Sequence, residues 1–358
     1  MNNPASGQPL SDVPMFFIIG RPRSGTTMLR MLFEAHPHVI IPPESPFIIS
    51  LYKNYGKIIF WDDVVIQSFT NDLMKQRYFD KWLISAEDLK AHLLKIKGEC
   101  TFQAMVKQVC LAYKSVYDKQ QIHLIGDKNP YYSLYIRRIH RLFPEAKIIH
   151  LTRDYRDNYL SLTNVNFEVP IVPLVVYRWK FAWRLASTLR KQHPGLVYAL
   201  RYEDLAANPE PEFGKLCDFL GIDFDPSVMN FYEKKSEVEK AYAGSGEIGV
   251  IHKSLLNPIS TSRMNLWKTE MSPKQIRTAD MVAGKTGRLA GYEPEFPGFS
   301  FGVWVKTLPM QVYGWLMYRL LLLGDYLPYQ MRNTLGRFLG IFLKVYWKFN
   351  QRKVKPLK

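Results

Sequence analysis

The chain has 358 residues, of which 47% are hydrophobic and 14% are aromatic. This composition excludes an intrinsically disordered chain and suffices for one large α/β domain with insertions. The 48 basic residues outnumber the 32 acidic ones and leave a net charge of +16, which indicates an anionic partner such as a nucleotide, a phospholipid surface, a sulfated product or nucleic acid.

The predicted elements alternate between strands and helices. Short aliphatic runs predict buried parallel strands over residues 15–20, 122–126, 147–152 and 196–201. A helix follows the first strand and ends at His36-Pro37, because proline cannot continue it. Residues 45–121 are mainly helical and rich in aromatic side chains, which indicates an insertion that covers the sheet. We therefore predict a P-loop-like three-layer α/β fold with a central, mainly parallel sheet over residues 15–300, a polar extension before it (1–14) and a basic helical tail after it (301–358).

A glycine-bearing loop joins the first strand to the first helix. The segment Gly20-Arg-Pro-Arg-Ser-Gly25-Thr-Thr27 places backbone N–H groups and the positive end of a helix dipole around one position, which suits an anion. Glycine at position 25 allows close backbone approach. Positive charge and hydroxyl donors come from Arg21, Arg23, Ser24, Thr26 and Thr27. A structural turn would need none of these side chains, so the loop predicts a phosphate site.

An ATP-binding P-loop is the alternative interpretation, because Gly20 and Gly25 have the Walker spacing. Threonine stands at position 26, however, where that motif has the lysine that reaches the phosphates. The strand over residues 147–152 runs into Arg153 instead of an aspartate that would support Mg²⁺. These two differences make a kinase the second interpretation instead of the first. A noncatalytic nucleotide-binding membrane adaptor is a further alternative.

The loop and its surroundings resemble a known family. The segment Pro22-Arg-Ser-Gly-Thr-Thr27, followed by His36-Pro37 and Glu44, is similar to the donor-binding region of PAPS-dependent sulfotransferases, most of all the tyrosylprotein branch. The resemblance implies an enzyme that takes a sulfuryl group from PAPS (3'-phosphoadenosine-5'-phosphosulfate), releases adenosine 3',5'-bisphosphate and uses no metal. It also implies that residues 23–27 bind the 5'-phosphosulfate.

A second donor-binding region follows the strand over residues 147–152. Arg153 and Ser161 lie just over two helical turns apart, and the resemblance implies that both bind the 3'-phosphate; an exposed ion pair is the alternative role for Arg153. The resemblance also implies that Tyr202 lies near the adenine; packing in the core is the alternative role for this side chain. It assigns Lys253 and Arg263 to a late loop over the 3'-phosphate, although several polar family positions in that loop are replaced here.

Glu44 is the predicted base for the acceptor hydroxyl, a role that typically contributes about 10²–10⁴-fold to the rate. It follows a strongly apolar segment and two prolines, and it matches the catalytic glutamate of the tyrosylprotein branch. His36 and His38 are alternative bases, because cytosolic family members use histidine, although a helix stop also explains His36-Pro37.

Lys128 lies in Gly126-Asp-Lys-Asn-Pro130 and resembles the family lysine that contacts the bridging oxygen of the donor. A cation at that point stabilises the transition state more than the ground state. We therefore expect an in-line transfer in which Lys128 and Arg23 stabilise the departing phosphate.

The C-terminal region is strongly basic. Residues 306–358 contain ten basic residues and one acidic residue. Over residues 335–351 a helical wheel separates a basic face from an apolar face, which is typical of an amphipathic helix. The run over residues 311–327 is too short to span a bilayer. We expect the tail either to lie on an anionic membrane surface or to dock on the protein itself.

Membrane contact would favour a sterol or lipid alcohol as the acceptor, held in an apolar pocket under the aromatic insertion. A peptidyl tyrosine or a sugar would instead need an open polar groove. Three scattered cysteines and the lack of a secretory signal over residues 1–14 predict a cytoplasmic protein, peripheral at the inner face of a membrane, in contrast to the Golgi tyrosylprotein and carbohydrate enzymes. No nucleic-acid partner is expected.

Overall fold

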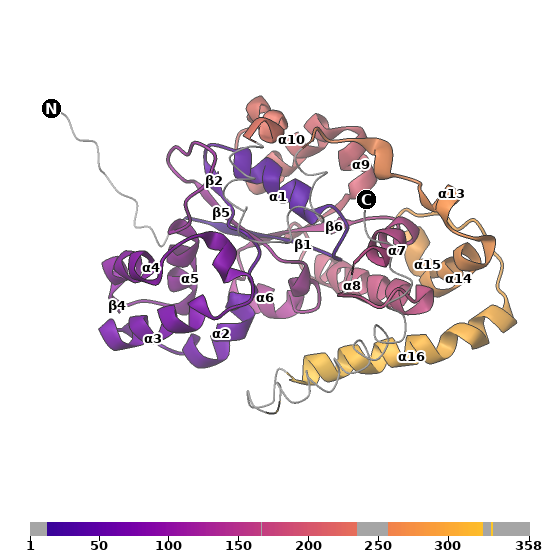
Figure 1. Cartoon of the computed structure of the whole chain (residues 1–358), viewed down its shortest axis with the longest axis horizontal. Coiled ribbons are helices and arrows are strands. Elements are labelled where there is room, and N and C mark those ends of the chain that lie inside the picture. The colour runs from indigo at the N-terminus through magenta and orange to yellow at the C-terminus, as the bar shows by residue number, and fades with distance from the viewer. Residues whose placement is uncertain (1–12, 166, 235–256, 325–330, 332–358) are drawn as a thin grey trace.

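A parallel sheet of five strands lies at the centre of the fold (Figure 1), in the order β2-β5-β1-β6-β7. The computed structural model describes residues 13–165, 167–234, 257–324 and 331. The strands are β1 (Met15–Gly20), β2 (Val39–Ile40), β5 (Leu124–Lys128), β6 (Lys147–Thr152) and β7 (Val197–Arg201). Because all their pairings are parallel, the carboxyl ends of the strands meet at one edge of the sheet.

The strand predictions are largely confirmed. The runs over residues 15–20 and 147–152 are strands with those bounds, and β7 begins one residue later than expected. The prediction for residues 122–126 is wrong at both ends, since β5 extends through two charged residues: Asp127 pairs with Phe17, and Lys128 pairs with Ile18. Pairing with β1 therefore extends β5 beyond its apolar residues into two charged ones.

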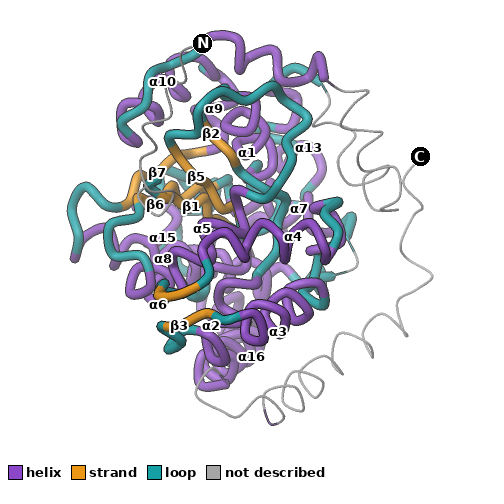
Figure 2. The backbone as a smooth tube through the Cα atoms, turned by 90° about the vertical axis from the view of Figure 1, so that its left-hand side faces the viewer, coloured by secondary structure: helices purple, strands orange, loops and turns teal. Residues whose placement is uncertain are grey.

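Helices cover both faces of the sheet, which confirms the three-layer α/β fold. Alternate residues of β1 face opposite layers: Phe16 belongs to one apolar cluster and Phe17 to the other. Figure 2 shows α1, α9 and α10 on one side of the strands and α6 and α8 on the other. These helices are α1 (Thr26–Ala35), α6 (Ile136–Leu142), α8 (Val172–Gln192), α9 (Tyr202–Ala207) and α10 (Pro209–Leu220), with the 3-10 helix η4 (Pro226–Lys234) beside α1.

The segment over residues 45–121 is mainly helical, and its aromatic side chains form its interior. Trp61 is fully buried and packs on Tyr55 and Phe69. A short antiparallel pair of strands in this segment was not predicted. The elements are α2 (Phe47–Tyr55), β3 (Phe60–Trp61), α3 (Asp63–Met74), η1 (Phe79–Trp82), α4 (Ala86–Leu93), η2 (Leu94–Ile96), β4 (Gly98–Glu99) and α5 (Phe102–Leu111).

The remaining elements lie at the carboxyl edge of the sheet and in the C-terminal part of the described chain. They are η3 (Pro130–Ser133), α7 (Tyr155–Thr163), η6 (Thr261–Arg263), α13 (Trp267–Glu270), α14 (Pro273–Ala283), α15 (Lys285–Leu289) and α16 (Phe301–Gly324). A buried carboxylate, that of Asp280, ties this part to α7: it accepts from the Tyr155 hydroxyl at 2.6 Å and the Phe296 amide at 2.9 Å, and lies 3.5 Å from Arg156 Nη1.

The last described helix, α16, packs against α8 and α14 (Figure 1). The Tyr318 ring lies 4.9 Å from that of Phe181 on α8. Many apolar side chains on the rest of the helix are exposed. No helix among the described residues is long and apolar enough to cross a membrane. The predicted amphipathic segment, residues 335–351, lies outside the described part of the chain.

Candidate active site

The loop between β1 and α1 joins a strand to a helix N-terminus, as its sequence predicts. Gly25 is the N-cap of α1 and has φ 93°, a left-handed conformation that favours glycine. A Cβ atom at this position would lie 2.6 Å from a ring carbon of Tyr202. The loop backbone therefore lies close to that ring, and the N-terminus of α1 lines a cavity.

Two polar side chains from other elements support the loop. The Ser133 hydroxyl accepts from the Gly20 amide at 3.1 Å. The Asn158 amide group donates to the carbonyl of Pro22 at 2.9 Å and to the Ser24 hydroxyl at 3.3 Å. Ser24 is fully buried, so its side chain serves this support. Neither Ser133 nor Asn158 was identified from the sequence, because each is separated from the loop by more than a hundred residues.

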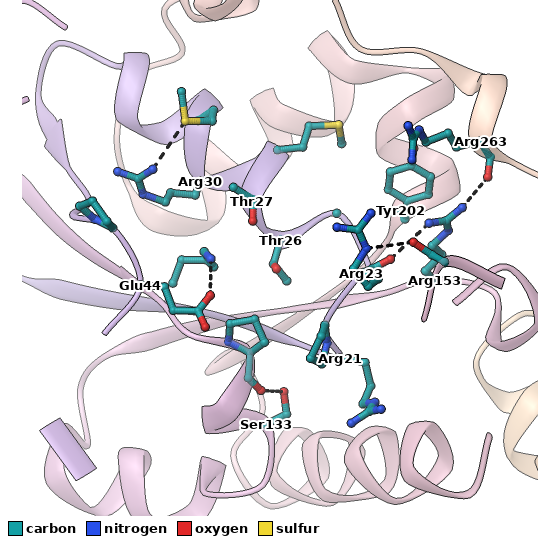
Figure 3. A pocket seen from close by; sticks show the side chains of 18 of the residues that line it. Arg21, Arg23, Thr26, Thr27, Arg30, Glu44, Ser133, Arg153, Tyr202 and Arg263 are labelled. Atoms are coloured by element: carbon teal, nitrogen blue, oxygen red, sulfur yellow. Dashed lines mark hydrogen bonds and ion pairs between the residues drawn. The ribbon is translucent and has the colours of Figure 1, made fainter. Parts of the chain in front are cut away.

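Three arginines gather on one side of the loop (Figure 3): Arg23, Arg153 and Arg263. Arg23 Nε donates to the Ser161 hydroxyl at 3.0 Å, and Arg153 Nη1 donates to the Arg23 carbonyl at 3.2 Å. The Arg153 guanidinium also lies over the Tyr202 ring, 4.9 Å from its centroid. Burial, followed by the charges of Arg263 and Arg153, lowers the pKa of Arg23. Such mutual repulsion is relieved when an anion binds between the guanidinium groups.

A carboxylate that the sequence did not reveal fixes the segment carrying Arg263. Asp157 Oδ2 accepts from the Asn265 amide at 2.8 Å, and its Oδ1 accepts from the Trp267 amide at 3.0 Å. These bonds join the segment that carries Arg263 to α7. This helix begins two residues after Arg153. The second residue assigned to this late loop, Lys253, lies outside the described residues.

Glu44 and Lys128 form an ion pair at the carboxyl edge of the sheet (Figure 3). Lys128 Nζ lies 2.7 Å from Glu44 Oε2. The lysine side chain is 5% exposed and the glutamate side chain 31% exposed, so the pair is anchored in protein and reaches solvent through the carboxylate. Burial raises the pKa of the neighbouring Asp127 to about 8, against the opposing charge of Lys128 and with a smaller contribution from Glu44.

The segment before Glu44 is held by buried charged groups. Arg30 Nε lies 3.0 Å from the carbonyl oxygens of both Ile41 and Pro42. The Ile41 amide donates to Glu34 Oε2 at 2.7 Å. Arg30 is only 5% exposed, and the sequence analysis assigned it no role. These contacts set the position from which Glu44 reaches Lys128.

The two histidines considered as bases are engaged elsewhere. His36 Nδ1 accepts from the His38 amide at 3.2 Å, and His36 Nε2 therefore donates to the Asp223 carbonyl at 2.9 Å. Burial lowers the pKa of His36. His38 stacks on His123 with ring centroids 4.5 Å apart. Both ring nitrogens of His36 are thus committed to structural bonds.

Arg21 points away from the arginine cluster (Figure 3). Its Nη2 lies 2.8 Å from Glu168 Oε2, and its Nη1 donates to the Tyr318 hydroxyl at 3.3 Å. Arg178 on α8 binds the other oxygen of Glu168 at 2.6 Å. The two guanidinium groups lower the pKa of Glu168 despite its burial. The first arginine of the loop thus connects the loop to α8 and α16.

A single cavity of about 830 Å³ unites these groups. Its lining includes every predicted site residue in the described chain except Ser24: Arg21, Arg23, Gly25, Thr26, Thr27, Glu44, Lys128, Arg153, Ser161, Tyr202 and Arg263. Neither His36 nor His38 lines it. The lining also contains side chains that no motif indicated: Arg77, Tyr78, Lys81, Tyr131 and Phe167.

Comparison with known proteins identifies the family. The model of the sulfotransferase family matches residues 14–226, which include the loop, the Glu44–Lys128 pair and Tyr202. The chain belongs to the sulfotransferase family. It is therefore an enzyme that transfers a sulfuryl group, and PAPS is its donor.

Among the relatives of this sulfotransferase are protein-tyrosine sulfotransferases. The zebrafish (Danio rerio) protein-tyrosine sulfotransferase 1 is 22% identical over 299 residues, which cover 81% of this chain and 76% of the relative. The human (Homo sapiens) enzyme of the same name is 24% identical over 295 residues, 79% of this chain and 70% of the relative. The sulfotransferase domain of the Synechococcus PCC 7002 olefin synthase has a TM-score of 0.49 and 21% identity, and the match covers 75% of this chain and 94% of the domain.

The residues of the sulfotransferase cavity fit such a donor. Arg153 Nε is buried and has no hydrogen-bond partner among the described residues, as expected of a group that awaits an anion. Gly25 and Thr26 at the N-terminus of α1 line the cavity, and the free backbone N–H groups of a helix N-terminus suit a phosphate. In the described part of the chain, no group of three or more His, Cys, Asp or Glu side chains could hold a metal ion.

Proposed function

We propose that the enzyme transfers the sulfuryl group of PAPS to the hydroxyl of an apolar acceptor, such as a sterol or lipid alcohol, with Glu44 as the general base. The observation that carries this proposal is that one cavity holds both the arginine cluster and the Glu44–Lys128 pair. The two groups lie on opposite sides of the phosphate loop (Figure 3), an arrangement that suits a donor on one side and an acceptor on the other.

Binding of the donor is assigned to the loop and the arginine cluster. The donor supplies the sulfuryl group and a bisphosphate that carries negative charge at both ends. Arg153, Ser161 and Arg263 would hold the 3'-phosphate, while residues 23–27 would hold the 5' end at the N-terminus of α1. Since Arg153 already covers one face of the Tyr202 ring, the edge or the other face of that ring remains for the adenine.

The Glu44–Lys128 pair would supply the chemistry. Glu44 accepts the proton of the acceptor hydroxyl, which makes the oxygen a better nucleophile. The Lys128 ammonium, relieved of its carboxylate partner as that carboxylate is protonated, is free to stabilise negative charge on the departing phosphate. The 2.7 Å separation of the two side chains supports this exchange, because proton uptake by one group releases the other.

Aromatic side chains support an acceptor with an apolar body. Tyr131 and Phe167 line the cavity and are 43% and 45% exposed, so an apolar ligand would remove their rings from water. Arg77 and Lys81 line the same cavity and would accommodate a polar or anionic end of the acceptor. The second candidate acceptor is a tyrosine side chain of a protein. Two observations favour it: relatives are named protein-tyrosine sulfotransferases, and the cations Arg77 and Lys81 line the cavity.

Contact with a membrane would bring a lipid acceptor to the site. The helix α16 exposes Val312, Trp315 and Leu316, and the basic residues of the C-terminal region follow it in the sequence. Apolar side chains beside basic ones are typical of a helix that lies on an anionic membrane. We therefore propose a cytoplasmic enzyme that is peripheral at the inner face of a membrane.

Calorimetric titration tests the donor assignment first. Adenosine 3',5'-bisphosphate should bind much more tightly than ATP, whereas preference for ATP would contradict the assignment. Radiolabelled PAPS, incubated with sterols, lipid alcohols, simple phenols and tyrosine peptides, then tests the acceptor. If a tyrosine peptide becomes labelled and no lipid does, the acceptor is a protein tyrosine and the proposed lipid alcohol is wrong.

A further inference from the structure

A second, smaller pocket lies between α8 and α15, away from the active site. Its volume is about 360 Å³, enough for a phosphate group and the atoms next to it. The charged lining residues are all cations: Arg184, Arg190, Lys191 and Lys285. The helices α8 and α15, which contact each other, supply its lining residues. None of these residues belongs to the cavity that binds the donor.

The positive charge of this pocket is not neutralised within the described chain. None of the four cations forms an ion pair with a described carboxylate, and α8 itself contains no Asp or Glu. Burial and the nearby Arg184 lower the pKa of Lys180, one turn earlier on α8, to about 8. Like charges that crowd together without counterions destabilise a fold, and a bound anion removes that penalty.

Polar contacts orient the pocket for an oxyanion. Arg184 Nε donates to the hydroxyl oxygen of Thr286 at 3.1 Å, and Thr286 is only 2% exposed. This bond leaves the terminal nitrogens of the guanidinium as donors. Ser187 adds a hydroxyl group to the lining, whereas the Thr188 hydroxyl donates to the Arg184 carbonyl at 2.8 Å. A planar guanidinium with neighbouring hydroxyls and ammonium groups is the donor set that phosphate groups prefer.

The neighbouring helix points to a lipid as the source of the phosphate. The helix α16 packs on the same α8: Tyr318 contacts Phe181, and Arg184 lies one turn beyond Phe181. Leu289, 60% exposed, lines the pocket itself. An apolar helix face and a cationic pocket held by one helix match the two parts of a phospholipid, its acyl region and its headgroup.

We propose that the pocket between α8 and α15 binds the phosphate group of an anionic phospholipid. The test uses the full chain saturated with adenosine 3',5'-bisphosphate, so that the active site takes no part. Sedimentation with vesicles of phosphatidylcholine plus phosphatidic acid measures the affinity. Because one cation near a membrane contributes about 1 kcal/mol, the double variant Arg184→Gln/Lys285→Gln should bind at least about tenfold more weakly.

The double variant Lys57→Gln/Lys114→Gln is the matched control, since it loses the same charge at exposed positions outside both cavities. It should retain nearly all of the binding. Equal losses in the two double variants would overturn the proposal, because general electrostatics would then explain the affinity. Equilibrium dialysis of radiolabelled inorganic phosphate distinguishes the source: a wild-type protein that binds phosphate but not vesicles would retain the anion site and overturn the lipid assignment.

Discussion

Replacing Glu44 by glutamine separates its chemical role from its structural one. The amide oxygen of glutamine can still accept a hydrogen bond from Lys128, whose side chain is 5% exposed and lies 2.7 Å from the carboxylate. The amide cannot take a proton from the acceptor. The variant should therefore keep the shape of the site and lose the base.

The expected loss is large for catalysis and small for folding. A positioned general base contributes about 10²–10⁴-fold, so kcat should fall by that factor, equivalent to ~3–5 kcal/mol in the barrier. The free energy of unfolding should fall by about 1–3 kcal/mol, because the buried ammonium keeps a hydrogen bond but loses its counter-charge. Affinity for adenosine 3',5'-bisphosphate should stay within about threefold, since the arginine cluster is unchanged.

Sulfuryl transfer from radiolabelled PAPS, with the acceptor that the wild-type enzyme uses best, measures kcat. Calorimetry on the same preparation measures nucleotide affinity. Glu145→Gln, at an exposed position outside the cavity, is the matched control and should leave both quantities unchanged. A Glu44→Gln enzyme that binds nucleotide normally and turns over within about threefold of wild type would refute the assignment of Glu44 as the base.

Three further variants test the loop, the C-terminal part and the buried carboxyl. Gly25→Ala should weaken adenosine 3',5'-bisphosphate binding at least about tenfold by calorimetry, because the position has φ 93° and a Cβ would lie 2.6 Å from an aromatic carbon. The control Gly214→Ala, where nothing lies within 4 Å of the added Cβ, should leave this affinity unchanged. Asp280→Ala should lower the free energy of unfolding in urea by about 3–5 kcal/mol, since it removes the acceptor of the buried Tyr155 hydroxyl and of the Phe296 amide and one of the two carboxylates paired with Arg156. Asp218→Ala on exposed surface should change it by less than about 0.5 kcal/mol. The folded-state pKa of Asp127, about 8, is above its ordinary value of 3.8, so the folded state binds the extra proton and stability should fall as pH rises from about 4 to about 8, by at most about 1.4 kcal/mol per pH unit. The Asp127→Asn variant should lack this slope in urea titrations over that range, and equal slopes would contradict the pKa.

Local patterns predicted the parts of the fold and site that depend on neighbouring residues. The strand, glycine loop and helix over residues 15–35 follow from periodicity and turn chemistry. Glu44 and Lys128 were selected separately, and the sheet brings them to 2.7 Å because β2 and β1 both pair with β5. Parallel strands with a shared carboxyl edge thus convert separate motifs into one site.

Residues that act across long sequence separations could not be predicted in this way. Ser133 and Asp157 support the site through bonds to backbone amides, and such bonds leave no pattern in the sequence around either residue. The direction of Arg21 depends on Glu168, which no motif marks. Tyr78 lines the cavity from a left-handed backbone position, φ 64°, that its residue type does not suggest.

The net charge of +16 indicated an anionic partner without indicating where that partner binds. Two pairs of arginines near the active site differ in their surroundings. Arg21 and Arg178 share the carboxylate of Glu168, so their charge is used within the fold. Arg153 donates to the Arg23 carbonyl, and burial, followed by the charges of Arg263 and Arg153, lowers the pKa of Arg23. Guanidinium groups held this close repel one another, and an anion bound between them would relieve that repulsion. The position at which cations cluster, and not the net charge, therefore indicates where an anion would bind.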